Sequence, residues 1–363
     1  MFTEMPIVIR TCAKYVQGKD AYKDIAKHAK PLSDGFCVLV DPFMMNIVKG
    51  TLEKSFSEAD IQYQFIEFGG ESSQKEVDRV AQIVVDSGLK GIMGVGGGKT
   101  LDTAKIVANK LNLPMISSPT SASSDAPCSG MAVVYSDDGV VDHYEMFSHN
   151  PELVYIDSQV VANGPSRLLV AGIGDALATF YEGRCNLRSY HENHVGGRNS
   201  LTSQACAKLC LDTIFAKGYE AKIACDKHVV TEALENIIEA NTYLSGFFES
   251  CGGGGAHSVH NGLTILPETH KYYHGEKVAF GTIVLMVLEN DSYEEINEVI
   301  KFCKKIGLPT CLKDLDVIED VENKMRQVAK LALAPDETIW SLPIALDEDK
   351  VYSAIMVADQ LGQ

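Results

Sequence analysis

The first 163 residues alternate between short apolar runs and amphipathic stretches. Residues 36–40 are apolar throughout and end at Asp41, which is typical of a strand buried on both faces of a parallel sheet. Residues 61–65, 92–95 and 115–116 indicate three further strands. Such runs, separated by helix-like stretches, predict an α/β sheet with helices on its faces.

One of these stretches carries both a start and a stop signal for a helix. Residues 73–76, with the sequence SQKE, have the form of a capping box, and Gly88 is placed to end the helix. Further along, residues 131–135 and 140–144 flank the sequence Asp-Asp-Gly at 137–139. This pattern predicts a β-hairpin.

The pattern changes after Asn163. Helical periodicity dominates from there to the C-terminus, and strand-like runs become scarce. Because a chain of 363 residues exceeds the length at which one hydrophobic core usually stops growing, we expect two domains. We predict an α/β nucleotide-binding domain at residues 1–163 and an all-α domain at residues 164–363.

Composition excludes several classes of protein. The net charge is −17, so binding to a nucleic-acid backbone is disfavoured, and no run approaches the ~18 apolar residues of a membrane span. The N-terminus lacks the basic and apolar regions of a secretion signal. The ten cysteines include no CxxC pair, which argues against a cysteine-based zinc ribbon. We therefore expect a cytoplasmic protein with free thiols.

A glycine-rich turn follows the predicted strand at 92–95. Residues 94–100, with the sequence GVGGGKT, precede a predicted helix at 101–110. Glycines allow close approach of the backbone to a diphosphate, and free N–H groups at a helix start attract anions. The turn fits neither standard nucleotide-binding fingerprint, so a plain strand–helix turn remains an equal alternative.

Asp41 gives the nucleotide interpretation some support. A carboxylate at the C-terminal end of a strand accepts hydrogen bonds from ribose hydroxyls and repels a 2′-phosphate, which favours NAD over NADP. On spacing alone, an Asp-Pro pair that starts a turn explains Asp41 equally well.

Four of the ten histidines lie close together in sequence. They are His257, His260, His270 and His274. Neutral imidazoles together with a carboxylate suit Zn²⁺ or Fe²⁺. The alternative is that these histidines bind no metal and are polar side chains on a surface turn.

Asp175 is our candidate for the carboxylate partner. It stands in a small, apolar stretch at residues 171–178, where an ionised carboxylate is costly unless it is paired or bound to metal. The alternative is an Asp that caps a helix after Gly174. A second possible ligand pair, His191 and His194, has polar neighbours that favour a solvated loop.

Four runs together resemble the iron-containing, or group III, alcohol dehydrogenase superfamily, in particular its polyol-oxidising members. The runs are GVGGGKTLDTAK at 94–105, SPTSASSDAPCS at 118–129, AGIGDALATFYEGR at 171–184 and AHSVHNGLTILPETHKYYHGEKVAFGT at 256–282. The resemblance covers most of the chain in order. It implies a dehydroquinate synthase-like fold, in which the active site lies between an α/β domain and a helical domain.

The resemblance also implies roles for individual residues. A catalytic Zn²⁺ would be held by Asp175, His257 and His274, and the polyol would be bound by Asp125 and His257. Iron-using members carry a histidine four residues after the ligand Asp, where this chain has Thr179. Residues implied to contact NAD are Asp41, Gly97, Gly98, Lys99, Thr120, Ser123, Ser129, Met131 and Tyr135.

The implied reaction is oxidation of glycerol, or a related vicinal diol, to dihydroxyacetone with NAD⁺. The metal would act as a Lewis acid on the reacting hydroxyl. Relatives commonly form octamers, so a homo-oligomer is expected. One rival is a 2-oxoacid or hydroxycarboxylate reductase on the same fold, for which Lys277 is the nearest candidate cation. Others are a lyase of the dehydroquinate synthase type and a catalytically silent NAD-binding protein.

Overall fold

The computed structural model describes residues 5–137 and 139–363. Within these residues, six strands form one parallel sheet in the order β1-β8-β5-β4-β2-β3. The strands are β1 (Tyr15–Gly18), β2 (Gly35–Val40), β3 (Gln62–Glu67), β4 (Ile92–Gly96), β5 (Met115–Pro119) and β8 (Leu153–Asp157). The predicted strands and the parallel sheet are therefore confirmed.

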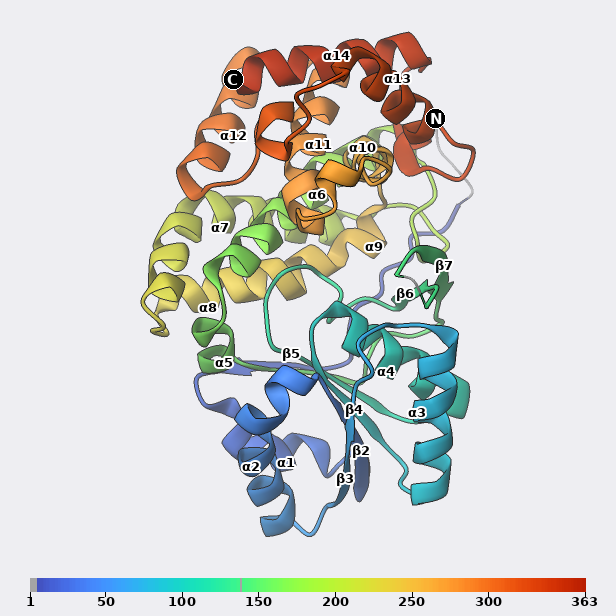
Figure 1. The fold of residues 1–363 in the computed structure, drawn as a ribbon, viewed down its shortest axis with the longest axis vertical. Helices are drawn as coiled ribbons and strands as arrows, with labels where there is room; N and C mark the ends of the chain where they lie inside the picture. The colour runs from blue at the N-terminus through green and yellow to red at the C-terminus, as the bar shows by residue number, and fades with distance from the viewer. Residues whose placement is uncertain (1–4, 138) are drawn as a thin grey trace.

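Helices cover both faces of this sheet, as Figure 1 shows. Along β2, Phe36, Val38 and Val40 pack with α1 (Ile25–Ala29) and α2 (Pro42–Glu58). The alternate residues Cys37 and Leu39 pack with α3 (Gln74–Ser87) and α4 (Gly98–Leu111) on the other face. Burial on both faces explains why this strand is apolar at every position.

The helix expected after residue 73 is α3, and Gly88 ends it with a φ of 72°. Of the two reciprocal hydrogen bonds of a capping box, only one forms. The Ser73 hydroxyl accepts a hydrogen bond from the Glu76 backbone N–H, but the Glu76 carboxylate accepts from Gly69 N–H at 2.7 Å and from Arg79. Glu76 thus ties the loop before the helix to its first turn.

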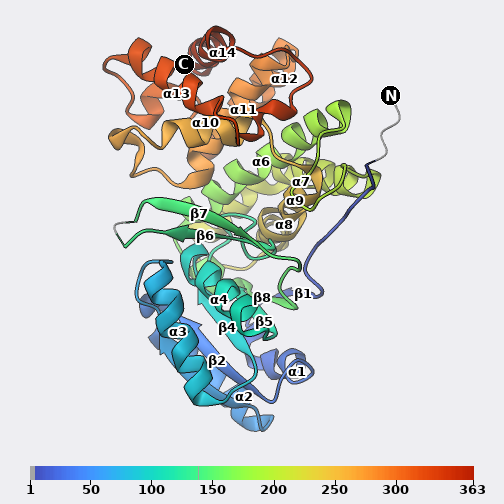
Figure 2. The same ribbon diagram turned by 90° about the vertical axis from the view of Figure 1, so that its right-hand side faces the viewer.

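The predicted hairpin is also present. It consists of β6 (Met131–Tyr135) and β7 (Val141–Met146), paired antiparallel. The second strand begins one residue later than expected and extends to Met146. Figure 2 shows the hairpin beside α4, on the side that faces the helical half.

Helices make up the second half of the chain. The α-helices are α5 (Ser158–Asn163), α6 (Ser166–Ser189), α7 (Leu201–Asp226), α8 (Glu232–Glu239), α9 (Phe248–Cys251), α10 (Gly255–Leu263), α11 (His274–Leu288), α12 (Tyr293–Ile306), α13 (Val321–Ala332) and α14 (Glu348–Gly362). The short 3₁₀ or π segments among the described residues are η1 (Ala21–Asp24), η2 (Ala240–Leu244), η3 (Ser245–Phe247), η4 (Pro267–Thr269), η5 (Leu312–Leu315) and η6 (Thr338–Ser341). Across residues 5–137 and 139–363, none of the helices is both long and apolar enough to span a membrane.

Gly164 and Pro165 separate α5 from α6. The division at residue 163 stays a prediction, because the N-terminal segment also packs against the helical half. The backbone N–H of Arg198 donates to Pro6 O at 2.9 Å, and Arg10 Nη2 lies 2.6 Å from Glu249 Oε2.

Candidate metal and cofactor site

Asp175 lies in the interior of α6, nine residues after the helix begins at Ser166. The alternative that it caps a helix is therefore wrong, because the helix starts well before Gly174. Its side chain is only 6 % exposed. A carboxylate in such a position needs a partner that offsets its lost hydration.

Glycines bring α6 into direct backbone contact with α11. A Cβ atom added at Gly275 would stand 1.8 Å from Ala171 O, and one added at Gly174 would stand 2.3 Å from Gly275 O. Only glycine permits this approach. Because Asp175 and His274 adjoin the contact, the crossing of the two helices brings their side chains together.

His257 reaches the same point from α10. The glycine run at 252–255 is not helical until its last member, and Gly252 has a φ of 92°. The helix begins at Gly255, so His257 lies in its first turn. The glycines thus delay the start of the helix to a point just before His257.

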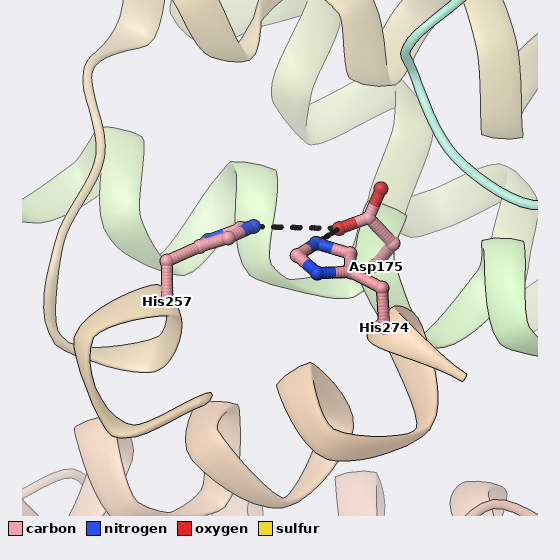
Figure 3. Close-up of side chains that lie close together, drawn as sticks. All are labelled: Asp175, His257 and His274. Carbon is pink, nitrogen blue, oxygen red and sulfur yellow. Dashed lines mark hydrogen bonds and ion pairs between the residues drawn. The ribbon is translucent and has the colours of Figure 1, made fainter. Parts of the chain in front are cut away.

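The three side chains converge, as Figure 3 shows. Asp175 Oδ1 lies 3.1 Å from His274 Nε2 and 3.4 Å from His257 Nε2. One ligand atom from each residue falls within 4.8 Å of the others. Two donors bound to one tetrahedral zinc at ~2.1 Å lie roughly 3.4 Å apart, so these separations fit a shared ion. Two imidazoles and one carboxylate also match a catalytic zinc site with an open position.

The charges in this cluster stabilise one another. Burial alone would raise the pKa of Asp175, but the imidazoles of His274 and His257 lower it. Burial alone would lower the pKa of His257, but the carboxylates of Glu182 and Asp175 raise it well above its usual value. The carboxylates of Asp175 and Glu182 thus favour a positive charge at the position of His257.

Residues beyond the converging trio support both histidines. Glu182 Oε2 lies 2.7 Å from His257 Nδ1, and His260 Nε2 lies 3.0 Å from His274 Nδ1. Burial, with the nearby His274, lowers the pKa of His260 well below its usual value. The sequence-based reasoning missed Glu182. Its position seven residues after Asp175, two turns along one helix face, was an available signal.

Asp125 lies on the loop after β5 and is half-buried. This loop contacts α6, since a Cβ atom at Gly172 would stand 2.0 Å from Ala122 O. Burial, followed by the carboxylates of Asp175 and Glu249, raises the pKa of Asp125 to about 8. Asp125 therefore shares the electrostatic environment of the converging trio.

The glycine-rich turn joins β4 to α4, as expected, but α4 starts at Gly98, three residues before the predicted helix. Gly97, Gly98 and Ser123 line one small pocket at the start of the helix. The backbone N–H of Thr120 donates to Gly96 O, which fixes the neighbouring loop against the turn. Free N–H groups in the first turn of α4 suit an anion.

Asp41 caps α2, where its carboxylate accepts from Phe43 N–H at 2.9 Å. It also adjoins the glycine turn, because a Cβ atom at Gly96 would stand 3.1 Å from Asp41 Cβ. The Asp-Pro pair therefore starts a helix and not a turn, so the turn-initiating alternative is wrong. A ribose contact at the same carboxylate stays a prediction.

The remaining predicted cofactor contacts lie around the hairpin. Lys99 Nζ is 2.6 Å from Glu71 Oε2 and 4.4 Å from the centre of the Tyr135 ring. Lys105 Nζ donates to Ser129 Oγ at 3.0 Å and to Met131 O at 2.8 Å. Ser129 is buried, so this lysine fastens the start of the hairpin to α4.

Of the other predicted candidates, His191, His194 and His270 do not belong to the converging trio. His191 is exposed, as a solvated loop predicts, but His194 is half-buried and its Nε2 accepts from Gly253 N–H at 3.0 Å. For His194 the expectation of a solvated side chain is wrong, because it supports the glycine run. His270 is exposed and contacts Thr264 O.

Comparison with known proteins identifies the family. The model of the family described as "Iron-containing alcohol dehydrogenase" matches residues 12–158. A glycerol dehydrogenase of Pseudomonas putida is 49 % identical over 360 residues, which cover 99 % of each chain. The chain belongs to the iron-containing alcohol dehydrogenase family. The resemblance stated from the four sequence runs is thereby confirmed.

Solved structures support the same conclusion about this family member. A probable glycerol dehydrogenase of Sinorhizobium meliloti has a TM-score of 0.92 at 40 % identity, with 98 % of this chain and 99 % of that chain covered. A glycerol dehydrogenase of Schizosaccharomyces pombe has a TM-score of 0.95 at 35 % identity, with 99 % and 92 % covered. The predicted fold class is confirmed, and the chain is an oxidoreductase.

Proposed function

We propose that this oxidoreductase oxidises glycerol, and related vicinal diols, to dihydroxyacetone with NAD⁺. The observation that carries the proposal is the convergence of Asp175, His257 and His274, and the Asp175 carboxylate also contributes to the raised pKa of Asp125. Full-length similarity to proteins named glycerol dehydrogenase supports the choice of substrate.

Asp175, His257 and His274 would hold Zn²⁺ through one carboxylate oxygen and two Nε2 atoms. Bound zinc supplies Lewis acidity toward the reacting hydroxyl. Two imidazole ligands and one carboxylate suit zinc, and Thr179, at the position of the fourth ligand in iron-using members, offers no imidazole.

Asp125 would orient the polyol by accepting a hydrogen bond from one of its hydroxyls. Oxidation of the secondary alcohol moves a hydride to the nicotinamide and releases one proton. A vicinal diol offers a second hydroxyl for Asp125, so the proposal predicts a preference for diols over simple alcohols.

For the cofactor, we propose that the diphosphate binds at the first turn of α4 and that the ribose binds Asp41. The free N–H groups of Gly97 and Gly98 attract the anion, and the Asp41 carboxylate repels a 2′-phosphate. NAD is therefore preferred over NADP. The composition of the chain favours the cytoplasm. The resemblance to the family favours a homo-octamer, whose mass light scattering would measure.

Two variants test the role of Asp125. Asp125→Asn should lose turnover of glycerol and 1,2-propanediol but keep NADH affinity, because its amide replaces the charged acceptor. Asp212→Asn, at an exposed position on α7, is the control and should behave as wild type. Turnover is followed as NADH production and binding as NADH fluorescence.

Two results would contradict the proposal. Wild-type turnover of 2-hydroxybutyrate alone would favour a hydroxycarboxylate dehydrogenase on the same fold. NADH binding without turnover of any of these substrates would indicate a catalytically silent protein.

A further inference from the structure

The His257 ring lies between two carboxylates. On one side, Glu182 Oε2 is 2.7 Å from His257 Nδ1, and on the other, Asp175 Oδ1 is 3.4 Å from His257 Nε2. The Phe248 ring packs against the imidazole, with the ring centres 4.6 Å apart. These three contacts define the orientation of the ring.

Glu182 is fully buried and makes two contacts with His257. Its Oε1 accepts the His257 backbone N–H at 3.0 Å, while its Oε2 faces the ring. The glycine run makes this possible, because a Cβ atom at Gly254 would come within 3.1 Å of Glu182 Cγ. The backbone that leads into α10 thus lies directly on the stem of Glu182.

The contact between Glu182 and Nδ1 of His257 matters because it affects which ring nitrogen carries the imidazole proton. A neutral imidazole carries one N–H, and an imidazole that binds metal through Nε2 must carry that proton on Nδ1. The proton then needs an acceptor at Nδ1. The Glu182 carboxylate oxygen at 2.7 Å is such an acceptor, so it favours the tautomer that leaves Nε2 of His257 free.

We propose that Glu182 is a positioning residue that fixes the tautomer and orientation of His257 and so sets the affinity of the site for zinc. The proposal rests on the proposed function, because it assumes a metal at Asp175, His257 and His274. Glu182 is a buried carboxylate that would act on the ion only through His257.

The test is the zinc dissociation constant of metal-stripped protein, measured by competition with a chromophoric chelator. Glu182→Gln keeps an oxygen for the backbone N–H but presents an amide N–H₂ to Nδ1, which selects the wrong tautomer. We expect the dissociation constant to rise by about 10–100-fold. Glu289→Gln is the control, since Glu289 is also a buried carboxylate of the helical half but contacts Arg184 and Arg188. Its zinc affinity should equal that of wild type.

The outcomes separate this inference from the proposed function. If wild type binds zinc and Glu182→Gln binds it equally well, the role of Glu182 is wrong while the metal site stands. Wild-type protein that binds no zinc would overturn both.

If circular dichroism shows that Glu182→Gln does not fold, the inference is tested by a measurement on the wild-type protein. In the ¹⁵N NMR spectrum of zinc-loaded protein, we expect the proton of His257 on Nδ1. A ring without a proton on Nδ1 would overturn the inference.

Discussion

The contact between α6 and α11 makes Gly275→Ala the most informative single substitution. A Cβ atom at Gly275 would stand 1.8 Å from Ala171 O, whereas ordinary contact begins at 3.4 Å. The obstacle is a backbone carbonyl that is held within a helix, so no side chain can rotate away. The helices must separate by about 1.6 Å to accommodate the methyl group, because closely packed interiors have no spare volume.

Such a shift should affect both stability and metal binding. Overpacking usually costs about 1–3 kcal/mol, and a clash with backbone should reach the upper end, about 3 kcal/mol. The same shift would move His274 Nε2 away from Asp175 Oδ1, now 3.1 Å distant, and out of reach of a shared ion. We therefore expect weaker zinc binding together with the loss of stability.

Urea denaturation measures the loss of stability, and competition with a chelator measures the loss of zinc affinity. Trp340 is the only tryptophan of the chain and lies in η6, so its fluorescence reports on the helical half. Gly50→Ala is the control, because Gly50 lies in α2 and a Cβ atom there has nothing within 4 Å. Urea denaturation followed by circular dichroism should show that Gly50→Ala raises the free energy of unfolding by roughly 0.5–1 kcal/mol. A Gly275→Ala protein with wild-type midpoint and zinc affinity would refute the reasoning.

Three further substitutions have defined outcomes. Asp41→Asn should keep the helix cap but raise kcat/KM with NADP relative to NAD, and an unchanged cofactor ratio would exclude Asp41 from the ribose site. Arg10→Met should lower the free energy of unfolding by about 3 kcal/mol, because it leaves the buried Glu249 unpaired, and Glu249→Gln in the same chain should restore part of the loss. Gly281→Ala should destabilise by roughly 1–3 kcal/mol, since its Cβ would stand 2.3 Å from Ala256 O; a wild-type urea midpoint would contradict that close approach.

Local signals in the sequence were sufficient for much of the fold. The apolar run at 36–40, the glycine stop at Gly88 and the hairpin each depend on short-range chemistry, and each is present. The start of α4 was placed three residues late. Glycines have low helix propensity, so the sequence alone did not show that Gly98 already belongs to the helix.

The candidate metal site depends on contacts between segments that are distant in sequence, which short-range sequence patterns do not report. Asp175, His257 and His274 were named from the sequence largely through resemblance, and the structure brings them together. The role of Glu182 depends on contact between α6 and α10, segments that are distant in sequence. His194 was misjudged for the same reason, because its partner Gly253 lies 59 residues away.

The most direct test of the account is diol oxidation by the purified protein before and after removal of metal by a chelator. NADH production from glycerol should disappear with chelation and return when zinc is added, because Asp175, His257 and His274 are proposed to hold the ion. Glycerol turnover that is indifferent to chelation, or that only iron restores, would contradict the proposed zinc site.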